Sequence, residues 1–102
     1  NFAHIQAIAE AYGISSAITA AATQYDYVAR YFAPHKGIND DPVTGSMHTG
    51  LAPLWSEQLG KTKLLAYQAS ARGGELFCEL KSTDRIEISG YAKLYMRANI
   101  QL

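Results

Sequence analysis

Hydrophobic residues recur at three- and four-residue spacing at the start of this 102-residue chain, between Asn1 and Tyr12. That spacing places them on one face of a helix. Asn1 is a residue type that caps helix starts, and Gly13 suits a left-handed cap at the helix end. The pattern therefore predicts a helix over residues 1–12, and its apolar face consists of Phe2, Ile5, Ile8, Ala9 and Tyr12.

A second stretch with helical spacing runs from Thr44 to Leu59, and Gly60 marks its end. Its apolar stripe consists of Met47, Leu51, Leu54, Trp55 and Leu59. Much of its remaining surface is small and consists of Gly45, Ser46, Gly50 and Ala52. Other elements can therefore surround this helix closely. Pro53 is a local conflict, because it lacks the N–H that would bond to Thr49, and we expect a kink that costs about 3 kcal/mol.

Elsewhere the apolar positions alternate, which is typical of strands. Residues 15–23 are interpreted as a strand, although their alanines are also compatible with a helix. In the next strand, residues 25–33, one face is rich in tyrosine, and we expect it to be half-exposed and to be a candidate partner surface. The remaining predicted strands cover residues 62–69, residues 75–81, a segment that starts at Asp84, and a last segment after Gly90 with Ala92, Leu94, Met96 and Ala98 on one face.

The order of these elements is helix, two strands, long helix and four strands. Four strands in succession favour antiparallel pairing, so the predicted fold class is α+β. We expect a single domain over residues 1–102, in which a bent antiparallel sheet wraps around the central helix at Thr44–Leu59.

Composition narrows the range of functions. Nine basic and nine acidic side chains cancel, and no cluster of Lys and Arg exists, so we expect no nucleic-acid partner. No apolar run is long enough to span a membrane, so we expect no membrane partner. The single cysteine, Cys78, excludes an internal disulfide and suits a reducing, cytoplasmic location; its alternation with Leu76 and Leu80 indicates a core position.

Acids, small residues and a hydroxyl gather just before the long helix, in the stretch from Gly37 to His48. The first turn of a helix has unpaired N–H groups and a positive dipole end, so it can bind a carboxylate. Gly45 allows close approach, Ser46 adds a hydroxyl, and Asp41 beside them is placed to orient a substrate or pass a proton. The alternative is an ordinary Asp-Pro turn, in which Asp41 or Thr44 only caps the helix.

Two other groups near this stretch leave alternatives open. His48 faces either the pocket or neighbouring strands, where it would be a hydrogen-bonded packing residue. Arg30 pairs either with Asp40 or with an acidic ligand, and a salt bridge within the protein is the preferred interpretation. No metal site is expected, because the spacing of His35, Asp40, Asp41 and His48 matches no common ligand pattern.

One pattern of residues runs through much of the chain. It consists of residues 30–34, the Gly-Ile-Asn-Asp-Asp-Pro-Val-Thr-Gly-Ser run at 37–46 and His48, and it continues with Leu54, Trp55, residues 59–61 and residues 68–74. This pattern resembles the phenazine-biosynthesis PhzF-like family of isomerases. The family has the diaminopimelate-epimerase-like fold, in which two similar halves enclose an active site. The chain resembles only the C-terminal half. The resemblance implies that Asp41 is catalytic and that Thr44, Gly45, Ser46 and His48 bind substrate. The family's N-terminal glutamate acid/base has no counterpart here.

The resemblance implies cofactor-independent proton transfer on a small carboxylate-bearing metabolite. A second half or a second copy would complete the site, and a homodimer would bring two copies of Asp41 to a shared cleft. Two alternatives stay open: a non-catalytic homodimeric module that binds small acids or is structural, and a fragment of a longer PhzF-like enzyme.

Overall fold

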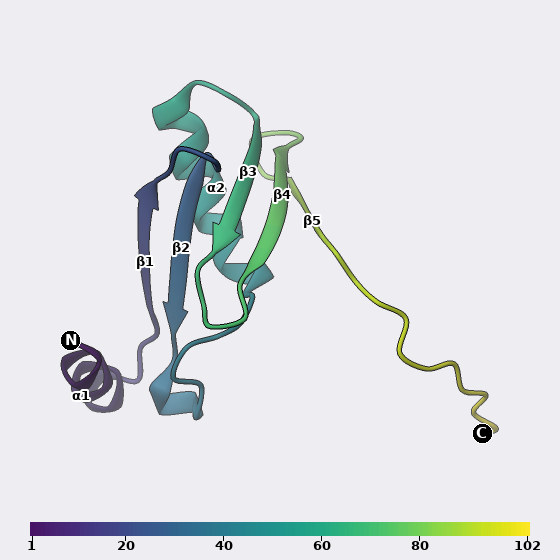
Figure 1. The fold of residues 1–102 in the computed structure, drawn as a ribbon, viewed down its shortest axis with the longest axis horizontal. Coiled ribbons are helices and arrows are strands. Elements are labelled where there is room, and N and C mark those ends of the chain that lie inside the picture. The colour runs from purple at the N-terminus through teal and green to yellow at the C-terminus, as the bar shows by residue number, and fades with distance from the viewer.

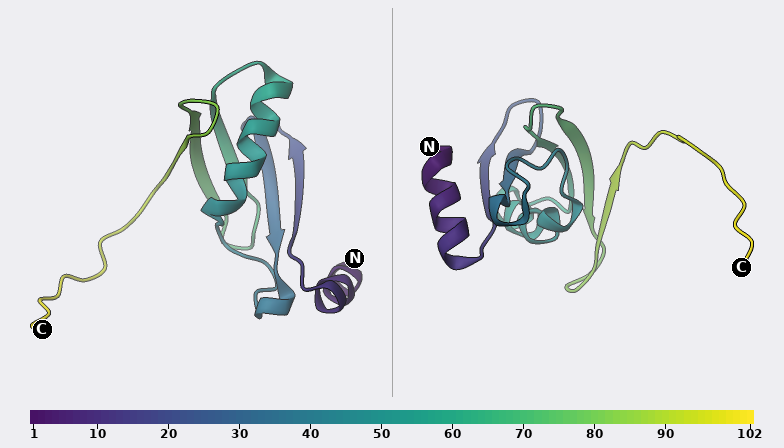
Figure 2. Two further views of the ribbon diagram at one scale, coloured as in Figure 1. Left: turned by 180° about the vertical axis from the view of Figure 1, so that it is seen from behind. Right: turned by 90° about the horizontal axis from the view of Figure 1, so that it is seen from below.

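The computed structural model describes all residues from Asn1 to Leu102. It contains one sheet with strand order β1-β2-β3-β4-β5 and a long helix, α2, against one face of that sheet (Figures 1 and 2). A shorter helix, α1, lies at one end of the molecule. The elements in chain order are α1 (Phe2–Tyr12), β1 (Ser16–Ala21), β2 (Tyr27–Phe32), the 3-10 helix η1 (Pro34–Lys36), α2 (Gly45–Leu59), β3 (Lys63–Gln68), β4 (Gly74–Leu80) and β5 (Ile86–Gly90).

The expected α+β class, with a sheet packed against the central helix, is confirmed. Strand pairing differs from the uniform antiparallel expectation at one place, because β2 pairs with β3 in parallel. The other three pairs, β1–β2, β3–β4 and β4–β5, are antiparallel. The reason lies in the connection: η1 and α2 carry the chain from the end of β2 back to the start of β3, as a parallel crossover requires.

The core lies between α2 and the middle strands. The Tyr27 ring stacks on Trp55, with centroids 5.7 Å apart and planes at 5°. Trp55 in turn donates its Nε1–H to Thr19 Oγ1 at 2.9 Å. The half-exposed tyrosine face is therefore corrected at one position, because Tyr27 is fully buried against the helix. Tyr25, which precedes the strand, and Tyr31 are half-buried, as expected. Cys78 is buried in the same core, as predicted.

The long helix turns part of the predicted stripe to the sheet, with Trp55 buried and Leu51 packed against the core. Its buried residues are His48, Ala52 and Trp55, whereas Leu54 and Leu59 remain exposed. Ala52 is completely buried, and its small side chain lets the helix approach the sheet closely. The helix continues through Pro53, which faces solvent.

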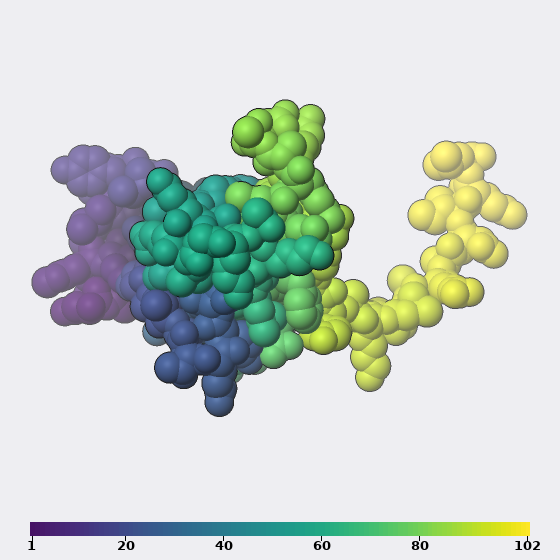
Figure 3. Space-filling model, turned by 90° about the horizontal axis from the view of Figure 1, so that it is seen from above, coloured from purple at the N-terminus to yellow at the C-terminus, as the bar shows by residue number.

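The two ends of the chain depart most from the sequence predictions. Ala9 is the only buried residue of α1, and the apolar side chains of Ile8 and Tyr12 are exposed. The strand predicted after Gly90 is absent, and residues 91–102 extend away from the body without regular structure (Figure 3). An alternating pattern alone does not make a strand, because the backbone must also find a hydrogen-bonding neighbour, and none lies beside this segment. No helix has the length and apolar character needed to cross a membrane.

Candidate functional site at the start of the long helix

The segment between β2 and α2 carries two adjacent carboxylates, Asp40 and Asp41, which bond to different partners. Asp40 accepts from Arg30 Nη2 through Oδ2 at 2.8 Å, so the predicted pairing of these two residues is confirmed. The Asp41 backbone N–H donates to the Tyr31 carbonyl at 2.9 Å, which fixes the next residue against β2. Asp41 is half-buried, and its Oδ1 has no hydrogen-bond partner within the protein. Each acid thus has one oxygen bonded within the chain and one without a partner, and the free oxygen of Asp40 is buried.

Thr44 stands at the position that usually caps a helix, but its hydroxyl does not cap α2. Instead, Thr44 Oγ1 donates to Asp41 Oδ2 at 2.5 Å. Its backbone N–H donates to the side chain of Gln68, at the end of β3. The predicted capping role of Thr44 or Asp41 is therefore replaced by a bond between the two side chains.

The first turn of α2 retains free backbone donors. The amides of Gly45 and Ser46 have no acceptor within the protein, as expected for the first turn of a helix. Both residues are exposed, so these N–H groups can reach a ligand. The positive end of the helix dipole adds to their attraction for an anion. The structure thus places Gly45 and Ser46 in the exposed first turn of α2, and their binding of a substrate stays a prediction.

The loop between β3 and β4 packs against this segment and holds it. Ser70 Oγ donates to the Pro42 carbonyl at 2.8 Å and accepts from the Gly73 N–H at 3.0 Å. Gly74 meets Val43 so closely that an added Cβ would lie 2.3 Å from Val43 Cγ2. The predicted turn is confirmed at Gly73, whose φ is 72°, whereas Gly74 is already the first residue of β4. The loop also supports the start of the helix.

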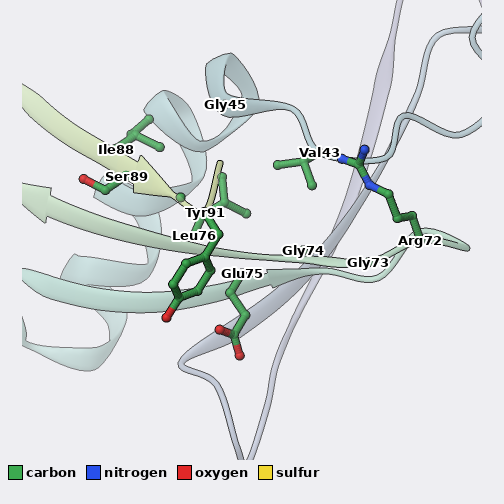
Figure 4. Close-up of a pocket in the computed structure, with 11 residues that line it drawn as sticks. Val43, Gly45, Arg72, Gly73, Gly74, Glu75, Leu76, Ile88, Ser89 and Tyr91 are labelled. Atoms are coloured by element: carbon green, nitrogen blue, oxygen red, sulfur yellow. The ribbon is translucent and has the colours of Figure 1, made fainter. Parts of the chain in front are cut away.

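A hollow of about 460 Å³ lies between this loop, the start of α2 and the end of β5 (Figure 4). Arg72 lies at its Val43 end and forms no ion pair within the chain. Gly45 is the one residue of the predicted site that lines the hollow. Arg72 was not among the predicted site residues, because its sequence context indicated only a hairpin turn.

His48 lies in the core, whereas Gly45 and Ser46, in the first turn of the same helix, are exposed. It is fully buried, and its Nδ1 lies 2.7 Å from the Tyr27 hydroxyl, while its Nε2 has no partner. Burial lowers the pKa of His48 and raises the pKa of Tyr27, so both groups favour their neutral forms. The packing interpretation describes this geometry. Contact between His48 and a ligand stays a prediction.

Gln68 is a second residue to which the sequence alone assigned no role, although it lies within the segment at 68–74 that resembles the family. It is fully buried and contacts both Asp41 and Thr44. A signal for it exists: Leu64, Ala66 and Gln68 alternate as the buried positions of β3, so a polar amide occupies a position where the pattern calls for an apolar side chain. No group of three or more His, Cys, Asp or Glu side chains lies close enough together to hold a metal ion.

Comparison with known proteins now defines the class. The model of the PhzC-PhzF family, described as phenazine biosynthesis-like proteins, matches residues 1–98. The chain belongs to this family.

Relatives in the family include proteins named as isomerases. An uncharacterized isomerase of Pseudomonas aeruginosa is 50% identical over 84% of this chain and 33% of its own length. Another, from Halalkalibacterium halodurans, is 42% identical over the whole chain and 38% of its own length. A phenazine biosynthesis-like domain-containing protein of Bos taurus is 51% identical over 74% of this chain and 26% of its own length. The chain thus spans 26% to 38% of the length of these relatives.

Solved structures agree with this assignment. A crystal structure described as a PhzC/PhzF phenazine biosynthesis protein of Clostridium difficile matches with a TM-score of 0.82 at 41% identity. The match covers 100% of this chain and 38% of that one. A PhzF-family protein of Enterococcus faecalis also has a TM-score of 0.82, at 43% identity over 94% of this chain and 36% of its own.

Proposed function

We propose that this chain supplies one half of an isomerase site that moves a proton on a small carboxylate-bearing metabolite without a cofactor. The observation that carries the proposal is the open start of α2, where the Gly45 and Ser46 amides lack partners beside a carboxylate with one free oxygen. Membership of a family whose relatives are named isomerases supports the same reaction class.

In this proposal the ligand carboxylate binds to the N–H groups of Gly45 and Ser46 and to the Ser46 hydroxyl. Fixed donors of this kind also stabilise negative charge that develops during the reaction. Asp41 Oδ1 takes a proton from a carbon of the ligand, and the electron pair of that C–H bond moves into the carbon framework. A second acid returns a proton at another carbon, so the product is an isomer and no oxidation occurs.

The second acid must come from outside the residues described above. A homodimer would supply another copy of Asp41, and the remaining length found in the relatives is the other possible source. Exposed apolar side chains support a partner surface, because α1 presents Ile8 and Tyr12 to solvent. Sedimentation of the chain measures this directly: a dimer supports the first source, and a strict monomer at high concentration contradicts it.

Solvent deuterium incorporation into a panel of small carboxylic acids tests the chemistry. Asp41→Asn keeps the side-chain size but cannot act as a base, and we expect incorporation to fall by about 100-fold or more. Asp40→Asn is the matched control, because Asp40 pairs with Arg30 on the protein surface, and we expect near-normal incorporation. Incorporation that survives Asp41→Asn would remove Asp41 from the acid/base role.

A second candidate function is binding of small acids without turnover. It is favoured by the bonds that the two neighbouring acids already make, Asp40 with Arg30 and Asp41 with Thr44, which leave neither carboxylate wholly free. NMR titration with acetate separates the two functions. Shifts of the Gly45 and Ser46 amide resonances without deuterium incorporation would indicate binding alone, and the absence of any shift would contradict both functions.

A further inference from the structure

The Gln68 side chain lies in the sheet, but all of its hydrogen bonds go to the segment before α2. It is fully buried, so no solvent can satisfy its polar atoms. Its Oε1 accepts from the Thr44 N–H at 2.7 Å. Its Nε2 donates to the Asp41 carbonyl at 2.7 Å and to Thr44 Oγ1 at 2.9 Å. A buried amide whose every partner is in the site is more than a filler of the core.

The partners determine the orientation of this amide without ambiguity. A backbone N–H can only donate and a backbone carbonyl can only accept, so Oε1 must face Thr44 N and Nε2 must face Asp41 O. The second Nε2 hydrogen then points at the Thr44 hydroxyl, which must accept it. The hydroxyl proton has one remaining acceptor, Asp41 Oδ2, at 2.5 Å.

We propose that Gln68 is a positioning residue for the reaction of Asp41. It directs the Thr44 hydroxyl proton onto Asp41 Oδ2 and leaves Oδ1 as the oxygen that exchanges a proton with the ligand. It also holds the Asp41 backbone through its carbonyl. This inference rests on the proposed function, and it adds a residue that sets which carboxylate oxygen reacts.

Gln68→Glu tests the donor role of the amide most directly, because it changes the side-chain volume very little and keeps the acceptor for the Thr44 N–H. An ionised carboxylate has no donor, so it would compete with Asp41 for the Thr44 hydroxyl proton and would face the Asp41 carbonyl with an oxygen. When protonated, the introduced carboxyl regains one donor. Gln58→Glu is the matched control, because Gln58 is an exposed residue of α2.

For the full chain of Gln68→Glu we expect deuterium incorporation at neutral pH to fall about tenfold, as the loss of one hydrogen bond to a charged group implies. Acetate binding at the Gly45 and Ser46 amides should change less than about twofold, because the Thr44 N–H keeps its acceptor. The rate should recover as pH falls and the introduced carboxyl takes up a proton. Gln58→Glu should leave rate, binding and pH profile unchanged.

A purely structural role predicts a different result. It would lower the free energy of unfolding and reduce rate and binding together, without recovery at low pH, and that pattern would overturn the proposal. Thr44→Val gives a second check: it removes the hydroxyl, so adding Gln68→Glu to it should lower the rate little further. Additive losses would also contradict the proposal.

One measurement separates this inference from the proposed function. If the wild-type chain neither binds acetate nor incorporates deuterium, the proposed function fails. The ¹³C chemical shift of the Asp41 carboxyl then still reports on the hydrogen bond to Oδ2. A shift change in Gln68→Glu that is absent in Gln58→Glu supports the positioning role, and an unchanged shift overturns it.

Discussion

The two α-helices of this molecule begin in opposite ways. At α1, the Asn1 side chain accepts from the Ala3 N–H at 3.1 Å, so the helix start is capped by its own preceding residue. At α2, the Thr44 hydroxyl is bound to Asp41 instead, and the amides of Gly45 and Ser46 are left open. The first start has a side-chain cap that stabilises its helix locally, and the second has no such cap and leaves two backbone donors without acceptors.

The rest of each helix explains why this difference is possible. α2 is anchored by Ala52 and Trp55 in the core, so it does not depend on a cap. α1 buries only Ala9 and touches the sheet region through Phe2, whose ring lies 6.3 Å from that of Phe32. Tertiary packing, more than local capping, stabilises helices in proteins. A helix held by the core can therefore keep its start open for chemistry.

The largest expected effect tests this anchoring. Trp55→Ala removes the stack on Tyr27 and the bond to Thr19, and we expect a loss of about 3–5 kcal/mol in the free energy of unfolding. Tyr12→Ala in α1 should change it by less than about 0.5 kcal/mol, because Tyr12 is 76% exposed. Urea unfolding measures both. Equal losses would show that α1 is held as firmly as α2.

The next effect concerns the loop that supports the open start. Gly74→Ala places a Cβ 2.3 Å from Val43 Cγ2, and we expect a loss of about 1–3 kcal/mol as Val43 is displaced. Gly50→Ala is the control: no atom lies within 4 Å of its added Cβ, and it should stabilise α2 by up to about 1 kcal/mol. Acetate binding should weaken only in Gly74→Ala. Unchanged stability there would mean that the loop does not support the helix start.

A third effect depends on pH and involves the buried side of the same helix turn. Burial lowers the pKa of His48 from its ordinary 6.5, so below that pH the unfolded chain binds a proton that the folded chain resists. The contribution of His48 is therefore fully present above about pH 6.5 and is lost progressively as pH falls. When the pH is lowered from above that value to below it, the urea midpoint of unfolding should decrease less in His48→Gln than in the wild type. His4→Gln, at an exposed position, should retain the full decrease.

The smallest effect on global stability is expected at α1. Asn1→Ala removes the cap and should cost about 1 kcal/mol of helix stability, which hydrogen exchange of the first α1 amides measures. The midpoint of global unfolding should hardly move, because α1 contributes one buried residue. A large decrease in that midpoint would show that the cap stabilises more than its own helix.

Much of the fold follows from patterns along the chain. Both helices, the order of the strands and the turn at Gly73 were predictable, because hydrophobic spacing and glycine positions report on local backbone geometry. The parallel pairing of β2 with β3 and the absence of a strand after Gly90 were not. Pairing depends on which edges meet in space, and that is not encoded in the alternation of one segment.

The candidate site divides in the same way. Asp41, Gly45 and Ser46 were recognised because they are neighbours in sequence at a helix start. Their place beside a ligand and the catalytic role of Asp41 stay predictions, as do the cytoplasmic location and the homodimer. Arg72 was not predicted, because its sequence neighbours indicate only a turn. Its position at the hollow depends on how the β3–β4 loop folds.

By itself, the sequence determined the α+β class, the long central helix and the polar stretch before it, since each depends on residues close together in the chain. Only the tertiary structure decided that His48 enters the core and that Asp40 and Asp41 have separate partners. It also decided that Gln68, which is 24 residues from Thr44, directs the hydroxyl beside Asp41. Such hydrogen bonds form between groups that only folding brings together, and their geometry follows from packing rather than from local pattern.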